Sequence, residues 1–174
     1  QDSSGIVYFN KEIQTIKVNY GFQHVYAASA FNLIADYYIG KQKYDSAFSY
    51  IQKALSSVCP GFRDPDIFSN PYEMEASLNL RLLKIYQSKI NALQLYSKSL
   101  TTSEIVNQQD HEKAIKLLNL AILTNIEAVD ILNRIKSNYL TQESRLFLAE
   151  KHIQVFSAGV ESSSKLYSLT ENPE

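Results

Sequence analysis

Hydrophobic residues between positions 31 and 54 recur at steps of three and four along the chain. On a helix of 3.6 residues per turn, such steps keep residues on one face. Gly40 and Lys41 interrupt the pattern at its centre, and small residues alternate with large ones, which allows a second helix to approach closely. The segment therefore predicts two antiparallel helices joined by a tight turn. Their inward positions are Phe31, Ile34, Ala35, Tyr38, Ala47, Ile51 and Ala54.

The same periodicity covers most of the remaining chain, and strand-type alternation is absent wherever the helical period is clear. Gly21 is suited to end the first helix because glycine tolerates positive φ, and Asp110 is expected to be the N-cap of the fifth. Residues 59–71 and 101–109 are predicted to be loops from their turn-forming composition. The sequence thus predicts an all-α fold of about six helices, the last three unusually long: 6–20, 25–39, 44–58, 72–99, 111–136 and 141–169.

The last predicted helix carries a regular stripe of mostly hydrophobic residues. Its members alternate at steps of three and four, which is the spacing of a seam between two long helices. We expect this seam to pack against another long helix. The stripe contains Leu146, Ala149, Ile153, Phe156, Val160, Ser163 and Tyr167.

The segment from Phe31 to Ala54 resembles the tetratricopeptide repeat (TPR), a 34-residue helix–turn–helix unit. It matches the pattern large-x2-aliphatic-small-x2-Tyr in the first helix and Ala-x3-large-x2-Ala in the second. Ala114-x3-Leu118-x2-Ala121 repeats the second half 67 residues later, which indicates a modified array. The resemblance implies a TPR-like right-handed superhelix of antiparallel helix pairs, which binds partners and carries no chemistry of its own.

The same resemblance implies which positions line the concave groove of the superhelix. Phe31 is placed at the fourth position of the repeat, and Tyr86 is aligned with Tyr38. A clamp for C-terminal carboxylates in this family uses Lys at the fifth position and Asn at the ninth, where this chain has Asn32 and Asp36; this argues against carboxylate capture. A solvated face without any ligand is the open alternative. The implied groove residues are Ser29, Asn32, Asp36, Ile39, Ser77, Leu80, Lys84 and Gln87.

The segment 133–170 resembles the stretch that precedes a CHAT domain, a caspase-like peptidase domain joined to TPR arrays in many bacterial proteins. This resemblance implies a single TPR-like domain over residues 1–174 that serves as an interaction scaffold or sensor module. The catalytic His and Cys of the peptidase-like domain would then lie beyond Glu174. The matching elements are Arg134 and Lys136, Glu143-Ser144-x-Leu146, Ala149-Glu150-Lys151, and Leu166-Tyr167-Ser168-Leu169-Thr170.

Composition narrows the classes of partner. The 174 residues are 45% hydrophobic and carry a formal charge of −1, with basic and acidic residues spread evenly. A nucleic-acid surface needs a basic face, so none is expected, and no apolar run approaches the roughly 20 residues that span a bilayer. Because the chain begins at Gln1 rather than Met, we expect a fragment or a processed product. A bacterial cytoplasmic location is favoured, and an exported form stays open.

Candidate catalytic chemistry is sparse. His24, His111 and His152 lie in three different elements without the spacing of a metal site, and the single Cys59 at a helix end is expected to be a small apolar filler. The carboxylates form no acid–base pair, and no Gly-rich phosphate loop is present. We therefore expect that the chain is not an enzyme and binds no cofactor or metal. We expect its partner to be a protein or peptide, or the missing domain of the same chain. The alternative is a structural, self-associating helical module.

Overall fold

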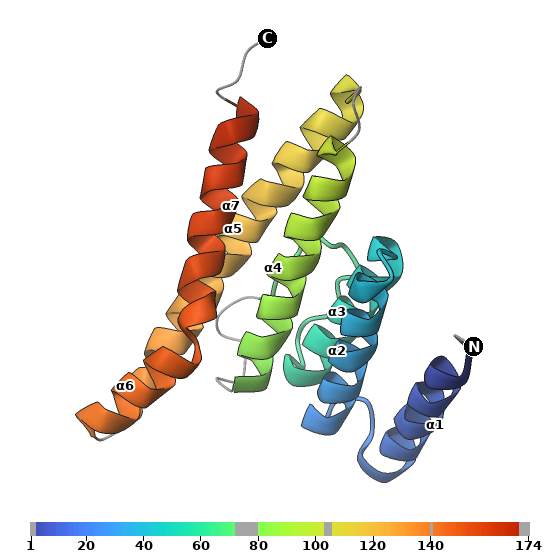
Figure 1. Cartoon of the computed structure of the whole chain (residues 1–174). Coiled ribbons are helices and arrows are strands. Elements are labelled where there is room, and N and C mark those ends of the chain that lie inside the picture. The colour runs from blue at the N-terminus through green and yellow to red at the C-terminus, as the bar shows by residue number, and fades with distance from the viewer. Residues whose placement is uncertain (1–2, 72–79, 103–105, 140, 171–174) are drawn as a thin grey trace. The chain divides into compact units, whose positions relative to one another are not determined.

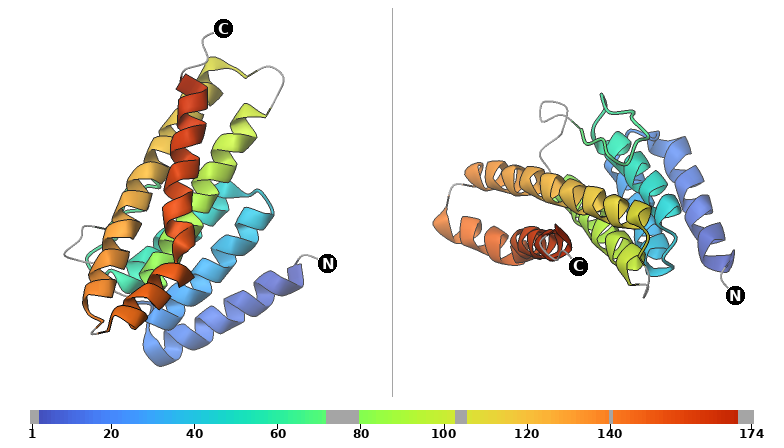
Figure 2. Two further views of the ribbon diagram at one scale, coloured as in Figure 1. Left: turned by 60° about the vertical axis from the view of Figure 1, so that its left-hand side comes forward. Right: turned by 90° about the horizontal axis from the view of Figure 1, so that it is seen from above.

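The computed structural model is all-α, which confirms the predicted fold class (Figure 1, Figure 2). It describes residues 3–71, 80–102, 106–139 and 141–170. Seven helices and no strand lie within these ranges, against about six helices predicted. They are α1 (Ser3–Tyr20), α2 (Val25–Gly40), α3 (Tyr44–Val58), α4 (Leu80–Thr101), α5 (Gln108–Ser137), α6 (Gln142–Lys151) and α7 (Ile153–Thr170).

The chain divides into two compact units, which we name unit 1 (Gln1–Ser88) and unit 2 (Lys89–Glu174). The boundary falls inside α4, so the first turns of this helix belong to unit 1 and the rest to unit 2. The prediction of one domain over residues 1–174 stays a prediction. Residues 72–79, the start of the predicted fourth helix, lie outside the described residues.

In unit 1, α2 and α3 form the hairpin that the periodicity predicts. Ala28, Ala35, Ala47 and Ala54 are completely buried, so the two helices pack closely. The helix ends also agree with the sequence. Gly21 follows α1 with a φ of +76°, and its N–H donates to Lys17 O, as expected of a glycine that ends a helix.

The start of α5 differs from the prediction. Asn107, rather than Asp110, is the N-cap: its Oδ1 accepts a hydrogen bond from the Asp110 N–H at 2.8 Å, and the helix begins at Gln108. In return, Asn107 Nδ2 donates to Asp110 Oδ2 at 2.7 Å. The two side chains hold the first turn reciprocally, and Asp110 still places its negative charge near the positive end of the helix dipole.

The predicted continuous helix over 141–169 is wrong, because the chain breaks between α6 and α7 at His152. Across the break, the Val155 N–H donates to His152 O at 2.9 Å, a bond that spans three residues instead of four. Both short helices pack against α5 in unit 2. No glycine or proline marks the break, so the sequence pattern gave no sign of it.

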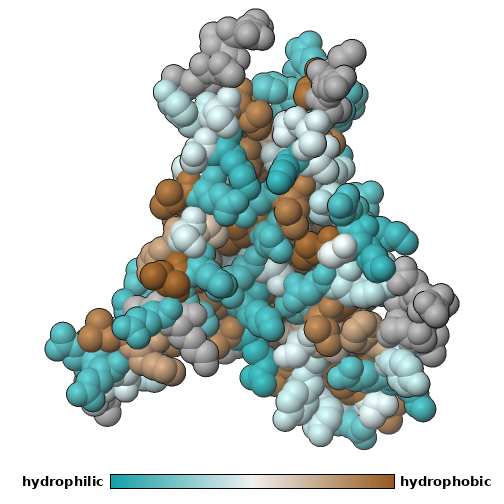
Figure 3. Space-filling view, in the orientation of Figure 1, coloured by the Kyte–Doolittle hydropathy of each residue, from teal (hydrophilic) through white to brown (hydrophobic). Residues whose placement is uncertain are grey.

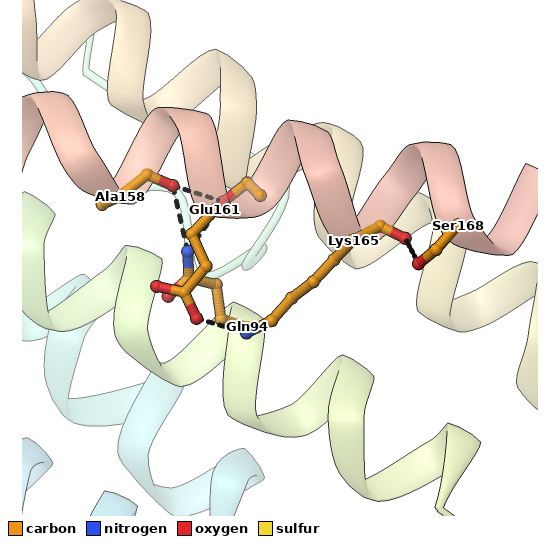
Figure 4. A network of polar contacts seen from close by, with 6 residues as sticks. Gln94, Ala158, Glu161, Lys165 and Ser168 are labelled. Carbon is orange, nitrogen blue, oxygen red and sulfur yellow. Dashed lines mark hydrogen bonds and ion pairs between the residues drawn. The ribbon is translucent and has the colours of Figure 1, made fainter.

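The predicted seam does not pack against another helix of the same chain, so that prediction is wrong for the single chain. Among the side chains of α6 and α7 that the structure describes, Leu148, Val155 and Ser162 are buried, whereas Ile153 and Val160 of the predicted seam are exposed. Ala149 of the predicted seam lies outside the described side chains. Hydrogen bonds explain the choice of face: Gln94 Nε2 of α4 donates to Ala158 O and to Ser162 Oγ, at 3.1 and 2.9 Å (Figure 4). These buried polar groups face inward because each finds its partner there.

Candidate functional site

A groove lies between α2 and the first turns of α4, entirely within unit 1. It encloses about 220 Å³. On each helix its residues follow steps of three and four, so the groove runs along one face of both helices. It is lined by Ala28, Ser29, Asn32, Leu33, Asp36, Arg81, Lys84 and Ile85.

A hydrogen-bonded triad of polar side chains supports one wall of the groove, with Asn32 and Ser88 buried and Asp36 half-buried. Asn32 Nδ2 donates to Asp36 Oδ2 at 3.3 Å and to Ser88 Oγ at 3.1 Å, and Ser88 Oγ donates to Asp36 Oδ1 at 2.7 Å. Asn32 is only 3% exposed. Its Oδ1 is buried and has no hydrogen-bond partner within the described part of the chain. Leaving such an acceptor unpaired costs about 1–3 kcal/mol.

The residues that line the groove carry a net positive charge, because Arg81 and Lys84 outnumber Asp36. Both oxygens of the Asp36 carboxylate already accept hydrogen bonds. Arg81 and Lys84 on α4 are exposed. Neither takes part in a hydrogen bond or an ion pair with any residue that the structure describes. Leu33 adds an apolar side chain that is 51% exposed.

Four of the eight groove residues predicted from the sequence line this groove together: Ser29, Asn32, Asp36 and Lys84. Ile39 is buried away from the groove, and Leu80 and Gln87 are not part of its lining. Ser77 lies outside the described residues. The sequence reasoning missed Ala28, Leu33, Arg81 and Ile85.

Arg81 and Ile85 were not predicted because the alignment of α4 selected a different face of the helix. Aligning Tyr86 with Tyr38 selects the face that carries Leu80, Lys84 and Gln87. The face that lines the groove is turned toward Arg81 and Ile85. One residue in the sequence indicates the face of α4 that lines the groove. Ser88 lies four residues after Lys84, and its hydroxyl can form the hydrogen bond that a buried amide such as that of Asn32 requires.

A second, larger cavity of about 790 Å³ lies beside α3 in unit 1. The loop over residues 59–71 brings three large apolar side chains, Phe62, Ile67 and Phe68. Phe62 is buried, Ile67 lines the cavity and Phe68 is 48% exposed, so only Phe62 fully enters the core. The lining mixes aromatic, charged and polar side chains: Ile13, Phe22, Gln23, Phe31, Asp45, Ser49, Tyr50, Gln52, Lys53, Ser56, Ser57, Arg63, Asp64, Pro65 and Ile67.

Gln52 organises the loop that borders this cavity. Its Nε2 group lies within hydrogen-bonding reach of three backbone carbonyls: Asp64 O at 3.4 Å, Asp66 O, and Ser69 O at 3.2 Å. An amide has two N–H groups, so the three acceptors share them. The loop is therefore held by one buried side chain of α3.

Tyr50 lies on the cavity wall, and its surroundings clearly shift the pKa of its hydroxyl. Burial, and then the neighbouring Tyr38, raise the pKa of the Tyr50 hydroxyl above its usual value of 10.0. The two rings stack with their centroids 5.6 Å apart, and the Lys53 ammonium lies 4.5 Å from the centre of the Tyr50 ring. Tyr50 thus serves chiefly as a packed aromatic side chain.

The candidate chemical residues occupy structural positions. His24 is the N-cap of α2, and its Nδ1 accepts from the Tyr26 N–H at 3.2 Å. Cys59 is buried at the end of α3. Among the described residues, no three His, Cys, Asp or Glu side chains gather as a metal site would require. Nor does any described helix combine the length and hydropathy needed to cross a bilayer.

Comparison with protein-family models, with curated proteins and with solved structures finds no match to this chain. The resemblances to TPR and CHAT-associated proteins therefore stay predictions. The site must be interpreted from its own geometry.

Proposed function

We propose that this chain is a non-catalytic interaction module that holds an extended segment of a protein partner in the groove between α2 and α4. The observation that carries the proposal is the pair Arg81 and Lys84, which are exposed on the groove wall and have no ion-pair partner in the described chain. Unengaged cations beside an apolar side chain, Leu33, favour a segment that carries both acidic and apolar residues.

The hydrogen-bonded triad supports the same proposal. Asn32 is fixed by Asp36 and Ser88, so the α2 wall keeps its shape when a ligand arrives. Such preorganisation lowers the entropic cost of binding.

The wider architecture and context are also proposed. The α2–α3 hairpin has the closely packed alanines of a TPR-like helix pair, and we extend this to a TPR-like right-handed superhelix. By the resemblance of segment 133–170, the module would act as a scaffold or sensor of a CHAT-type, peptidase-like protein. The bound segment then belongs either to another protein or to that domain of the same protein.

Selection of peptides on the protein tests the groove. Random displayed peptides are enriched on residues 1–174, and the dissociation constant of the strongest is measured by fluorescence anisotropy. We expect enriched peptides to contain acidic residues. The double variant Arg81→Ala/Lys84→Ala should weaken binding about 10-fold or more, because each charge-assisted hydrogen bond contributes about 1.5–3 kcal/mol.

Lys11→Ala is the matched control, because Lys11 is an exposed lysine of α1 outside the groove. This variant should bind the same peptides as tightly as the wild type. Peptides that bind the double variant and the wild type equally would show that the groove is not the binding site.

A further inference from the structure

The outer face of α6 and α7 carries large apolar side chains. We name this set the outer stripe; it lies in unit 2. Hydrophobic residues are visible along the outer edge of α7 and on α6 (Figure 3). The members, with their exposed fractions, are Leu146 (55%), Phe147 (65%), Ile153 (64%), Phe156 (39%), Val160 (72%) and Tyr167 (64%).

The inner face of α7 has the opposite character. Its contacts to α4 use Ser162 and a backbone carbonyl of Ala158, both of which accept from Gln94 (Figure 4). Its contact to α5 places Gly159 beside Asn125. A surface helix normally buries its large apolar residues and exposes its small and polar ones. On α7 only Val155 and Ser162 are buried, and the large apolar residues Ile153, Phe156, Val160 and Tyr167 are exposed together with polar ones. This helix therefore has apolar side chains available for a second partner.

The area of the outer stripe matches that of a specific interface. Three of the six side chains are aromatic, and a fully exposed aromatic side chain presents about 150–250 Å². The three aliphatic side chains present somewhat less each, so at these exposed fractions the six together present on the order of 600 Å². Two such surfaces facing each other would bury roughly 1,200 Å², the lower limit for stable protein–protein interfaces. A patch of this size is at the upper end of what a monomeric protein exposes, and such patches are often functional.

The spacing on α7 fits a helix of the same sequence. Ile153, Phe156, Val160, Ser163 and Tyr167 alternate at steps of three and four, the 3.5-residue period of a seam between two paired helices. In a parallel pair each residue would face itself, with Phe against Phe and Ser against Ser, which leaves a void beside a crowded layer. In an antiparallel pair, Phe156 can face Val160 of the second copy, and Ile153 can face Ser163 of the second copy. Large residues then meet smaller ones in every layer, as close packing requires.

Electrostatic repulsion between the two copies of α7 does not oppose this pairing. Residues 153–160 carry no charged side chain. The two that follow on the helix, Glu161 and Lys165, form an ion pair with each other at 2.5 Å. Two copies of α7 would therefore meet without like-charge repulsion.

From this geometry we propose that the outer stripe is a self-association surface, occupied by the outer stripe of a second copy of this chain in antiparallel orientation. The pair is a closed, two-fold symmetric dimer in which Phe156 and Val160 form the two central layers. This proposal is independent of the groove, because it uses other residues in the other unit.

Sedimentation velocity on residues 1–174, over concentrations of about 1–200 µM, tests the proposal. We expect the wild type to shift from monomer to dimer within this range. Val160→Glu should raise the dimer dissociation constant at least 10-fold. Because Val160 is 72% exposed in the single chain, this variant should keep the circular dichroism spectrum and melting temperature of the wild-type monomer.

Val18→Glu is the matched control. Val18 is a valine that is 82% exposed on α1, outside the stripe, so this variant should dimerise as the wild type does. A wild type that stays monomeric at 200 µM would overturn the proposal and leave the stripe to a different partner. Equal dimerisation of Val160→Glu and the wild type would overturn it as well.

The orientation has its own test. Phe156→Lys alone should block dimerisation, as Val160→Glu does. Combined in one chain, the two substitutions set lysine against glutamate in the antiparallel pair, and dimerisation should return. In a parallel pair the same double variant sets like charges against each other, so a double variant that stays monomeric would contradict the antiparallel orientation.

Discussion

At the scale of single residues, Gly159 shows how tightly α7 packs on α5. A Cβ atom added at Gly159 would overlap the Asn125 side chain. Asn125 is buried, and its Nδ2 donates to Val155 O at 2.5 Å, so it cannot move without losing that bond. Gly40 at the end of α2 is the opposite case, because an added Cβ meets nothing within 4 Å.

Substituting these two glycines should therefore have effects of opposite sign. Alanine is favoured over glycine in a helix by about 1 kcal/mol. Gly40→Ala should retain part of this gain and stabilise the protein by up to about 1 kcal/mol. Gly159→Ala should be destabilising by about 1 kcal/mol, because the lost buried hydrogen bond costs about 1–3 kcal/mol and outweighs the gain. Urea unfolding curves measure both values, and a stabilised Gly159→Ala would contradict the described α5–α7 packing.

Tyr50 gives a pH dependence at the same scale. Its pKa is raised in the folded state, so the folded chain holds the hydroxyl proton more tightly than the unfolded chain does. This contribution to stability is fully present below the usual pKa of 10.0 and is lost as the pH rises through the folded-state pKa. Tyr50→Phe keeps the stacked ring but has no proton to lose.

The free energy of unfolding of the wild type should therefore fall more steeply between about pH 9 and pH 11 than that of Tyr50→Phe. Guanidinium chloride unfolding at the two pH values gives the difference, and the other titrating groups cancel in the comparison. An identical fall in both proteins would show that the surroundings of Tyr50 do not favour its neutral form.

At the scale of elements, the sequence predicted those helices whose inner faces are hydrophobic. The bounds of α3 agree with the prediction, and α2 ends one residue beyond it, because large and small apolar residues mark both helices unambiguously. The inner face of α7 was not predictable in this way. Its side chain at Ser162 is held by hydrogen bonds that hydrophobic periodicity cannot detect.

The residues of the candidate groove likewise fall into those that were predicted and those that were not. Ser29, Asn32 and Asp36 were predicted because the hairpin fixes the orientation of α2. The contribution of α4 was predicted only at Lys84. The Asn32–Ser88 hydrogen bond, which joins this face of α4 to α2, connects residues 56 positions apart. Contacts at that separation are set by the tertiary fold and leave no periodic signal in one sequence.

At the scale of the whole molecule, unit 2 depends on its last two helices. α5 has 30 residues, about 45 Å in length. It packs against α6 and α7, and its own inner positions, including Thr124 and Ala128, are completely buried. Without those neighbours the apolar face of α5 would be in contact with water, and long helices in water are only marginally stable.

Deleting residues 141–174 should therefore reduce helicity by more than α6 and α7 themselves contribute, and should broaden the thermal transition. Circular dichroism at 222 nm gives both quantities against the full chain. A sharp transition at the original temperature, with only the share of α6 and α7 lost, would contradict this dependence.

The separation of hydrogen-bonded partners along the chain has a kinetic consequence for unit 1. Gln52 binds carbonyls at most 17 residues away, whereas the Asn32–Ser88 bond closes a loop of 56 residues. The entropic cost of closing a loop grows with its length, by about 0.6 kcal/mol for each doubling. We therefore expect the α2–α3 hairpin and its loop to fold first and the groove to form last. The surface proposed to hold a partner is then also the first part of unit 1 to open.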